Sequence, residues 1–244
     1  MKICIIVPVY NHEEAITFVV SKLKAYGLPC FLINDGSSSV CTQVLKDCTM
    51  RESKWITLLT RHENGGKGAA VMDGFKEAIR LGFTHAIQID ADGQHDLNDI
   101  PYFLEASRLN PQAMVLGSPL FDDLVPKGRF YGRKITTLWI WINTLSLVIA
   151  DGMCGFRLYP LAAVEQLISK TPIAKGMDFD IDIVVRLYWQ GAEFITIPTA
   201  VKYPCDGVSH FKLWRDNLMI SLTHARLFFG MLVRIPKLIR RRWR

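Results

Sequence analysis

The stretch AIQIDADGQHD, residues 86–96, joins a short apolar run to two carboxylates, Asp90 and Asp92, with one residue between them. The run 86–90 has the length of a buried strand. In extended chain, side chains two residues apart point to the same side, so both acids face one way and Gln94 follows them as the chain turns. Two or three oxygens on one side suit a hard divalent cation such as Mg²⁺ or Mn²⁺. The alternative is that these acids cap the next helix at an exposed turn.

On both sides of this stretch, apolar runs alternate with segments of helical spacing. The chain has 244 residues, 50% of them apolar and 21% charged, which is a globular composition. The alternation predicts an α/β fold with a mostly parallel sheet and helices on both faces, in which ligands bind at the carboxyl ends of the strands. Predicted strands span residues 3–9, 30–34, 56–60, 86–90 and 114–117, and predicted helices span residues 13–26, 40–52, 68–81 and 100–109.

The second half of the chain is less regular. Residues 135–150 carry no charge over sixteen positions, short of the roughly 20 residues that span a bilayer, and predict a buried or interfacial helix. Residues 178–192 predict a further helix and residues 194–203 a strand. The chain from residue 211 onward predicts a long amphipathic helix that ends in basic residues.

Cysteine usage and the amino terminus bear on the compartment. Six cysteines include no C-x-x-C pair, so neither a zinc site nor a disulfide framework is indicated and reduced thiols are expected. The first apolar run is too short for a signal peptide. We therefore expect no export.

Two further motifs follow predicted strands. In ENGGKGAA, residues 63–70, glycines beside Lys67 at a helix start suit a phosphate, although the spacing is not that of a Walker loop. Tyr10, Glu13 and Asp35 follow the first two strands, where an aromatic face and a carboxylate suit a nucleotide base. The alternatives are a glycine-rich turn with a solvated lysine, a helix cap and an Asp-Gly-Ser turn.

Six motifs in this order closely resemble glycosyltransferase family 2, which has the GT-A fold, a Rossmann-like α/β architecture. The nearest branch contains the dolichyl-phosphate and polyprenyl-phosphate sugar synthases. The resemblance covers most of the chain, from residue 3 to residue 211. The motifs are VPVYNHEEAI (7–16), LINDGSSS (32–39), ENGGKGAAVMDGF (63–75), IDADGQHDLNDIP (89–101), DGMCGFRLYP (151–160) and DGVSHF (206–211).

The resemblance assigns donor-site roles to individual positions. It implies that Asp90 and Asp92 are the D-x-D acids at a nucleotide sugar, that Gln94 is a third metal ligand, and that Asp92 serves catalysis through the metal. The family often has two acids before Gly-Ser, whereas this chain has Asn34 then Asp35, and UDP and GDP both stay open. The resemblance places Pro8, Tyr10, Glu13 and Asp35 at the base and ribose.

Further donors around the phosphates are implied at Lys67, Arg157 and His210. For Arg157 the alternative is a structural ion pair with Asp151, and for His210 a surface turn. A departing diphosphate develops negative charge, and a bound divalent cation stabilises that charge.

The sequence leaves two kinds of acceptor open, a lipid phosphate and a hydroxyl group. A lipid phosphate is already anionic and needs no general base, and Arg129 and Arg133 would then clamp it. A hydroxyl acceptor needs a carboxylate to take its proton. The resemblance implies an acid near the acceptor in the segment with Asp178, Asp180 and Asp182. Asp182 is the predicted base, with a helix cap as the alternative for these acids. Pro119 stands where the polyprenyl-phosphate synthases often have Arg, which favours a hydroxyl-bearing lipid.

The positive charge of the chain lies in its tail. The formal net charge is +6, and after Asp216 there is no acidic residue but seven basic ones. Without those seven, 22 basic residues face 23 acidic ones, a charge of −1. A basic amphipathic helix with an apolar face fits a membrane surface better than nucleic acid. We expect a transferase domain at residues 1–211 and a membrane-associating tail at residues 212–244, attached peripherally to the cytoplasmic face of a membrane such as the bacterial inner membrane.

The sequence thus predicts a metal-dependent inverting glycosyltransferase that moves a sugar from UDP or GDP to a membrane lipid. A sugar-phosphate nucleotidyltransferase shares the fold and metal, but needs a glycine-rich basic loop after the first strand, where this chain has PVYNHEE. A basic adaptor that binds lipid or nucleic acid without catalysis is the other alternative.

Overall fold

The computed structural model describes residues 1–121, 127–201 and 211–242. A seven-stranded sheet of order β3-β2-β1-β4-β6-β5-β7 runs through these residues. Strand β6 is antiparallel to β4 and β5, and the other pairings are parallel. The strands are β1 (Ile3–Val9), β2 (Cys30–Asn34), β3 (Ile56–Thr60), β4 (His85–Gln88), β5 (Met114–Phe121), β6 (Arg157–Pro160) and β7 (Phe194–Val201).

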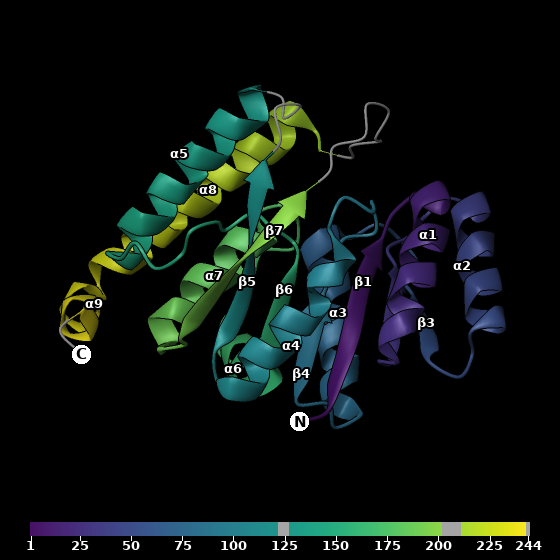
Figure 1. Cartoon of the computed structure of the whole chain (residues 1–244). Helices are drawn as coiled ribbons and strands as arrows, with labels where there is room; N and C mark the ends of the chain where they lie inside the picture. Colours follow the sequence, from purple (N-terminus) through teal and green to yellow (C-terminus); the bar gives the residue numbers. More distant parts are fainter. Residues whose placement is uncertain (122–126, 202–210, 243–244) are drawn as a thin grey trace.

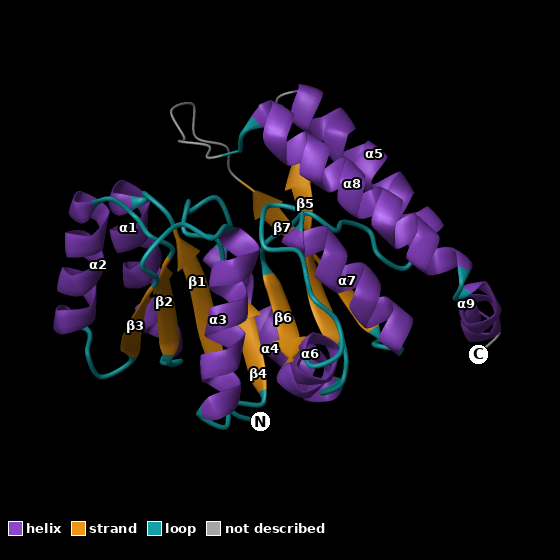
Figure 2. Ribbon diagram, turned by 180° about the vertical axis from the view of Figure 1, so that it is seen from behind, coloured by secondary structure: helices purple, strands orange, loops and turns teal. Residues whose placement is uncertain are grey.

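Helices cover both faces of this sheet (Figures 1 and 2). Short 3-10 turns follow α1 (Lys24–Tyr26) and precede α4 (Leu97–Asp99). The helices are α1 (Glu13–Leu23), α2 (Ser39–Arg51), α3 (Lys67–Arg80), α4 (Ile100–Leu109), α5 (Lys127–Thr144), α6 (Leu161–Ile168), α7 (Phe179–Gln190), α8 (Leu213–Leu232) and α9 (Ile235–Arg242).

The sheet separates two apolar cores. Alternate residues of β1 point to opposite faces, so Cys4 and Ile6 lie in the core with α3 and α7, whereas Ile5 and Val7 lie in the core with α1 and α4. Burial on both faces explains the unbroken apolar run of β1. The polar residues that follow the parallel strands therefore meet at one edge of the sheet.

The first half of the chain confirms the predicted alternation. The predicted bounds of β1, β2, β3 and α4 match those observed, and the sheet is mostly parallel with helices on both faces, as expected. The cysteines among the described residues are free thiols, in line with the expectation.

The second half departs from the prediction in its details. Residues 135–144 of the uncharged run form the second half of α5, which begins at Lys127, and residues 145–150 lie beyond the end of that helix. The short antiparallel strand β6 and helix α6 were not predicted. Four residues are too few to show a period, and an antiparallel strand breaks the β-α alternation.

The predicted basic tail forms α8 and α9. Figure 1 shows α5 and α8 side by side, with α9 beyond them near the carboxyl terminus. Ile220, Leu227 and Met231 of α8 are buried in the same core as α3 and α7. Helix α8 thus packs as part of the domain. The boundary at residue 211 stays a prediction, and it concerns only which part of the chain attaches to a membrane.

No single helix among the described residues has the length and apolar character needed to cross a membrane. Helices α8 and α9 meet that test only when they are taken together, and an 81° bend separates them.

Candidate functional site

A cleft of about 990 Å³ opens at the carboxyl ends of the parallel strands. The loops after β1, β2, β3 and β4 form one wall, and α5, residues 175–180 and the start of α8 form the other. The predicted site residues that line this cleft are Pro8, Tyr10, Asp35, Lys67, Asp90, Asp92, Gln94 and Arg133.

The centre of the cleft is a lysine between two carboxylates. Nζ of Lys67 lies 2.7 Å from Oδ1 of Asp90 and 2.7 Å from Oδ2 of Asp180. Lys67 is the first residue of α3, Asp90 follows β4, and Asp180 lies in the first turn of α7. The cluster therefore joins three elements that are far apart in the sequence.

Electrostatics favours the charged forms of Lys67 and Asp90. Burial would raise the pKa of Asp90, but attraction by Lys67 and a contact with His95 outweigh it and hold that pKa far below its usual range. Burial would lower the pKa of Lys67, but attraction by Asp180 and Asp90 raises it above its ordinary value. The Lys67 ammonium and the Asp90 carboxylate thus stabilise each other's charged form.

Two neighbours fix the direction of Asp90. Nε2 of His95 lies 3.5 Å from Oδ2 of Asp90. On the other side, a Cβ atom on Gly155 would come within 2.1 Å of Oδ2, so only glycine leaves room for this carboxylate. The DGMCGFRLYP motif thus contributes a wall against the acid, and His95 is a site residue that the sequence reasoning missed although it lies in the same turn as the D-x-D acids.

The acids suit a divalent cation that also takes ligands from a substrate. Oδ1 of Asp90 is buried and faces the Lys67 ammonium at 2.7 Å, so a cation that binds this oxygen has to displace Lys67. Asp92 and Gln94 line the same cleft, and Oδ1 of Asp92 accepts a hydrogen bond from the Gln94 amide at 3.0 Å. The described residues contain no cluster of three or more His, Cys, Asp or Glu residues able to hold a metal. A divalent cation held here by Asp90 and Asp92 needs further oxygen ligands, such as those of a diphosphate.

Asp35 organises the glycine-rich turn. Its two oxygens accept hydrogen bonds from the amides of Gly65 and Gly66, both at 2.9 Å, and Oδ1 lies 2.8 Å from Nε of Arg61. These amides had been expected to face a phosphate. In the structure they face Asp35, because Gly66 (φ 94°) turns the chain into α3 beside this buried carboxylate. The predicted contact of Asp35 with a base remains a prediction.

Arg157 has a positioning role in this structure. Its side chain is 0% exposed and does not line the cleft. The guanidinium donates to the backbone carbonyls of Cys154, Gly152 and Asp180 at 2.6–2.8 Å. The expected direct contact with donor phosphates is therefore not seen, since these carbonyls hold the side chain in the core.

Asp182 is the clearest correction. The predicted general base is fully buried and does not line the cleft. Its oxygens accept from the Ala174 amide and from Arg186, and lie 3.3 Å from Arg226 of α8. Positions two apart on a helix differ by about 200°, so Asp180 faces the cleft while Asp182 faces α8. Asp178 also faces α8, where it accepts from Thr223 at 2.6 Å.

The remaining predicted residues have other positions. Glu13 does not line the cleft. Arg133 does line it, and forms a two-pronged ion pair with Asp151 at 2.8 and 3.0 Å. Asp151, the partner considered for Arg157, thus pairs with Arg133. His210 and the side chain of Arg129 lie outside the described residues.

Lys175, Lys212 and Arg215 also line the cleft, and the sequence reasoning had not selected them. All three lie on the wall that belongs to the second half of the chain. Their positions depend on how α8 packs, which the sequence pattern alone does not fix. They add three cations to this wall, which Asp180 and Asp216 also line.

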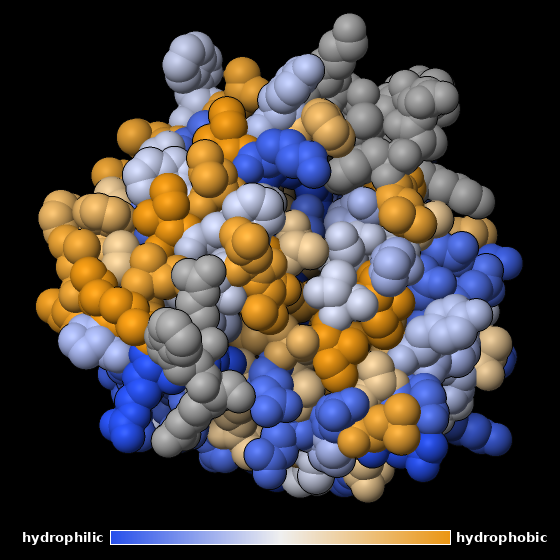
Figure 3. Space-filling model, turned by 60° about the vertical axis from the view of Figure 1, so that its left-hand side comes forward, coloured by the Kyte–Doolittle hydropathy of each residue, from blue (hydrophilic) through white to orange (hydrophobic). Residues whose placement is uncertain are grey.

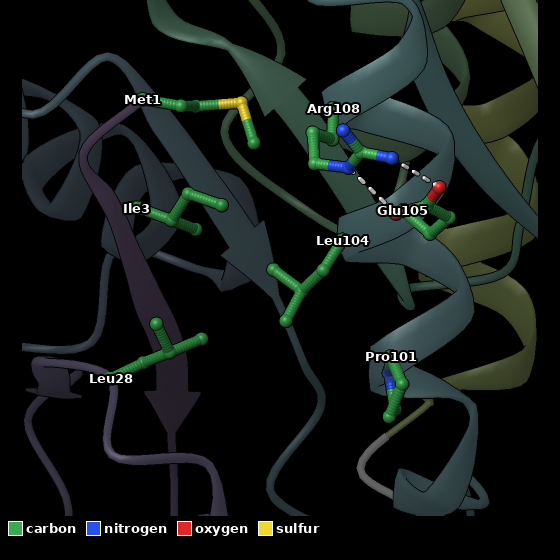
Figure 4. Close-up of a pocket in the computed structure, with 7 residues that line it drawn as sticks. All are labelled: Met1, Ile3, Leu28, Pro101, Leu104, Glu105 and Arg108. Carbon is green, nitrogen blue, oxygen red and sulfur yellow. Dashed lines mark hydrogen bonds and ion pairs between the residues drawn. The ribbon is translucent and has the colours of Figure 1, made fainter.

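A smaller pocket of about 350 Å³ lies at the amino end of β1 (Figure 4). Met1, Ile3, Leu28 and Leu104 give it an apolar wall. Its two charged lining residues, Glu105 and Arg108, pair with each other, as the dashed lines show. The cleft at the carboxyl ends is thus the stronger candidate for a functional site.

The fold is that of the GT-A class of glycosyltransferases. The family model described as "Glycosyl transferase family 2" matches residues 4–166. The chain belongs to this family and is a glycosyltransferase, which confirms the resemblance and the fold predicted from the motifs.

Two relatives cover most of the chain. It is 26% identical over 206 residues to the undecaprenyl-phosphate mannosyltransferase of Micrococcus luteus, covering 81% of this chain and 82% of that one. It is 23% identical over 210 residues to the polyprenol monophosphomannose synthase of Mycolicibacterium smegmatis, covering 80% and 75%.

Solved structures share the fold at low identity. Glucosyl-3-phosphoglycerate synthase from Mycobacterium tuberculosis, in complex with Mn²⁺ and UDP-glucose, has a TM-score of 0.63 at 13% identity and covers 94% of this chain and 78% of its own. A mannosyltransferase from Pyrobaculum calidifontis, in complex with GDP-Man and Mn²⁺, has a TM-score of 0.61 at 14% identity, covering 96% and 64%.

Proposed function

We propose that this glycosyltransferase transfers a sugar from a UDP or GDP donor to a lipid phosphate at a membrane surface, with a divalent metal and with inversion at the anomeric carbon. One observation carries the proposal. A single cleft has the carboxylates of Asp90 and Asp92 on one wall and the basic residues Arg133, Lys175, Lys212 and Arg215 on the other. The first wall suits a metal-bound diphosphate, and the second suits an anionic acceptor.

The donor side is supported by the strand-end residues. Asp90 and Asp92, with Gln94, would hold Mg²⁺ or Mn²⁺ together with the diphosphate, and the bound metal would offset the negative charge of the departing nucleotide. Pro8, Tyr10 and Asp35 line the cleft beside them, where a base and ribose would lie. The M. tuberculosis and P. calidifontis structures contain Mn²⁺ with a UDP-sugar and a GDP-sugar, so either nucleotide is compatible with this fold.

The acceptor side favours a phosphate. Arg133, Lys175, Lys212 and Arg215 line this wall, and both relatives are named for polyprenyl-phosphate chemistry. An anionic oxygen attacks the anomeric carbon directly as the bond to the diphosphate breaks, so no general base is needed. Asp182, which is buried away from the cleft, is then not required for proton transfer.

Apolar side chains near the cleft support membrane attachment. Trp214 is 89% exposed and Phe229 68% on α8, and Ile135 and Leu138 are exposed on α5. Figure 3, which brings this side of the molecule forward, shows broad orange apolar areas. Leu213 and Met219 are exposed and also line the cleft. We infer that α5 and α8 rest on the cytoplasmic surface of a membrane, so that a lipid headgroup enters from that side.

Mass spectrometry of lipid products tests this function. The full chain is incubated with UDP- and GDP-sugars, Mn²⁺ or Mg²⁺, and vesicles that contain either a polyprenyl phosphate or the corresponding polyprenol. We expect a glycosylated lipid phosphate from one nucleotide class, and loss of product with EDTA. Product from the polyprenol alone would refute the phosphate acceptor, and no product from any donor would refute the proposed function.

A further inference from the structure

We propose that Lys67 is an internal counter-ion that takes the place of the divalent cation until the donor arrives. Metal and donor diphosphate would then bind cooperatively, because the diphosphate gives Lys67 another anionic partner. This inference rests on the proposed function, since it concerns the metal site of Asp90 and Asp92.

The geometry places the ammonium where a cation would otherwise lie. Nζ of Lys67 is 2.7 Å from an oxygen of Asp90 and 2.7 Å from an oxygen of Asp180. The two carboxylates come from different elements, the turn after β4 and the first turn of α7, and the Lys67 ammonium lies within reach of both. An ammonium at that point satisfies them electrostatically, as a divalent cation would.

Lys67 is the mobile member of the cluster. Asp180 is held by the amide of Gln88 at 3.1 Å and by Arg157 at 3.5 Å, both of them buried. Asp90 is confined by Gly155. Lys67 has a flexible four-carbon stem and begins α3, so its ammonium can swing into the cleft without any change in the backbone.

The formal charges favour this exchange. Asp90, Asp92 and Asp180 carry three negative charges and Lys67 one positive charge, which leaves −2, the charge that one divalent cation balances. A divalent cation at Asp90 and the ammonium repel each other, so a metal that binds alone competes with Lys67. A diphosphate adds negative charge and draws the ammonium away, and by linkage metal and diphosphate then strengthen each other's binding.

Calorimetric titration of Mn²⁺ into the full chain, with and without UDP or GDP, separates this role from a purely structural ion pair. We expect Lys67→Met to bind Mn²⁺ alone about tenfold more tightly than the wild type. The gain in Mn²⁺ affinity caused by the nucleotide should shrink by about the same factor. Lys67→Arg, which keeps the charge, should retain the weak binding of Mn²⁺ alone. Equal or weaker Mn²⁺ binding by Lys67→Met would overturn the inference.

A charge-balanced comparison covers the case in which Lys67→Met does not fold. Asp180→Asn and the double variant Lys67→Met/Asp180→Asn differ only at the lysine, and the double variant should again bind Mn²⁺ more tightly. Asp92→Asn separates the two proposals. If it abolishes Mn²⁺ binding while the lysine variants match their references, only the role of Lys67 fails. If Mn²⁺ binding is unaffected by Asp92→Asn, the metal site of the proposed function fails as well.

Discussion

The cleft and the outer layer of α7, α8 and α9 use charge in different ways. In the cleft, Lys67, Asp90 and Asp180 pair with one another and face the cavity. In the outer layer of α7, α8 and α9, charged groups such as Asp182 and Arg241 hold helices together. Aspartates two positions apart in α7 thus line the cleft in one case and pack between helices in the other, and only the direction of the side chain separates them.

Neutralising a cleft acid should have the largest effect. Asp90→Asn removes the negative charge of a proposed metal ligand from the cleft. We expect the rate of sugar transfer to fall by about a thousandfold, the scale on which preorganised electrostatic groups contribute to catalysis. Initial rates of transfer at saturating Mn²⁺ measure this loss. Asp99→Asn, a nearby acid that does not line the cleft, should keep the wild-type rate. If the rate of Asp90→Asn stays within a factor of ten of the wild type, the cleft acids do not differ from the acids of the outer layer in their effect on turnover.

Neutralising the acid of the outer layer should change stability instead. Asp182→Asn leaves Arg186 and Arg226 without their buried carboxylate, and we expect the free energy of unfolding to fall by about 3 kcal/mol. Urea denaturation measures this change, with the exposed Glu165→Gln as the control, expected within about 0.5 kcal/mol of the wild type. Should Asp182→Asn stay fully stable yet lose turnover, the acid would belong to the chemistry after all.

The outer layer should also be sensitive to acid through His224. Burial lowers the pKa of this histidine from 6.5 to about 4. The unfolded chain then binds more protons than the folded one between these values, so stability is full above pH 6.5 and declines as the pH falls toward 4. From pH 7.5 to pH 5 this histidine should cost about 2 kcal/mol of stability.

Replacement of this histidine isolates the effect. Thermal or urea unfolding of His224→Gln should show a pH dependence that is flatter than that of the wild type by the same amount. Parallel pH profiles of the two proteins would contradict the burial of a neutral histidine between α5 and α8.

Two adjacent arginines of α9 provide the finest comparison. Arg241 donates to the carbonyls of Tyr188 and Ala192 at the end of α7 and lies 4.0 Å above the Tyr188 ring, whereas Arg240 is exposed. Arg241→Ala should lower stability by about 1 kcal/mol. Arg240→Ala should leave stability unchanged and weaken binding to anionic vesicles by about fivefold, the share of one basic residue near the surface. Urea unfolding and co-sedimentation with anionic vesicles measure these two changes. If both variants lose the same stability and the same vesicle binding, Arg241 and Arg240 do not have separate roles.

Local pattern predicted the strands of the first half well and the outer layer poorly. Strands β1, β2 and β3 and the acids at Asp90 and Asp92 follow from apolar runs that end in polar turns, so their common edge could be foreseen. Helix α7 is buried almost all around from Phe179 to Val185, and its sequence has no polar face to show which aspartate meets the cleft. The choice of Asp182 was therefore wrong.

The other differences between the prediction and the structure concern charged side chains that are buried or packed against other helices. Arg157 follows the motif pattern of a ligand-binding residue, but the backbone carbonyls that surround it are set by tertiary packing and leave no trace in the sequence. The tail shows the same limit. Its apolar spacing predicted an amphipathic helix, yet which residues pack on α5 and α7 and which stay exposed depends on the orientation of α8. Arg226, Arg234 and Arg241, counted at first as surface charges, contact Asp182, Trp189 and Tyr188.

The most direct test of the donor site is anomalous diffraction from crystals grown with Mn²⁺ and UDP or GDP. The account predicts one manganese peak between the carboxylates of Asp90 and Asp92 and the diphosphate oxygens, with the Lys67 ammonium turned toward the phosphates. A bound diphosphate with no manganese at these acids, and with Lys67 still between Asp90 and Asp180, would contradict it.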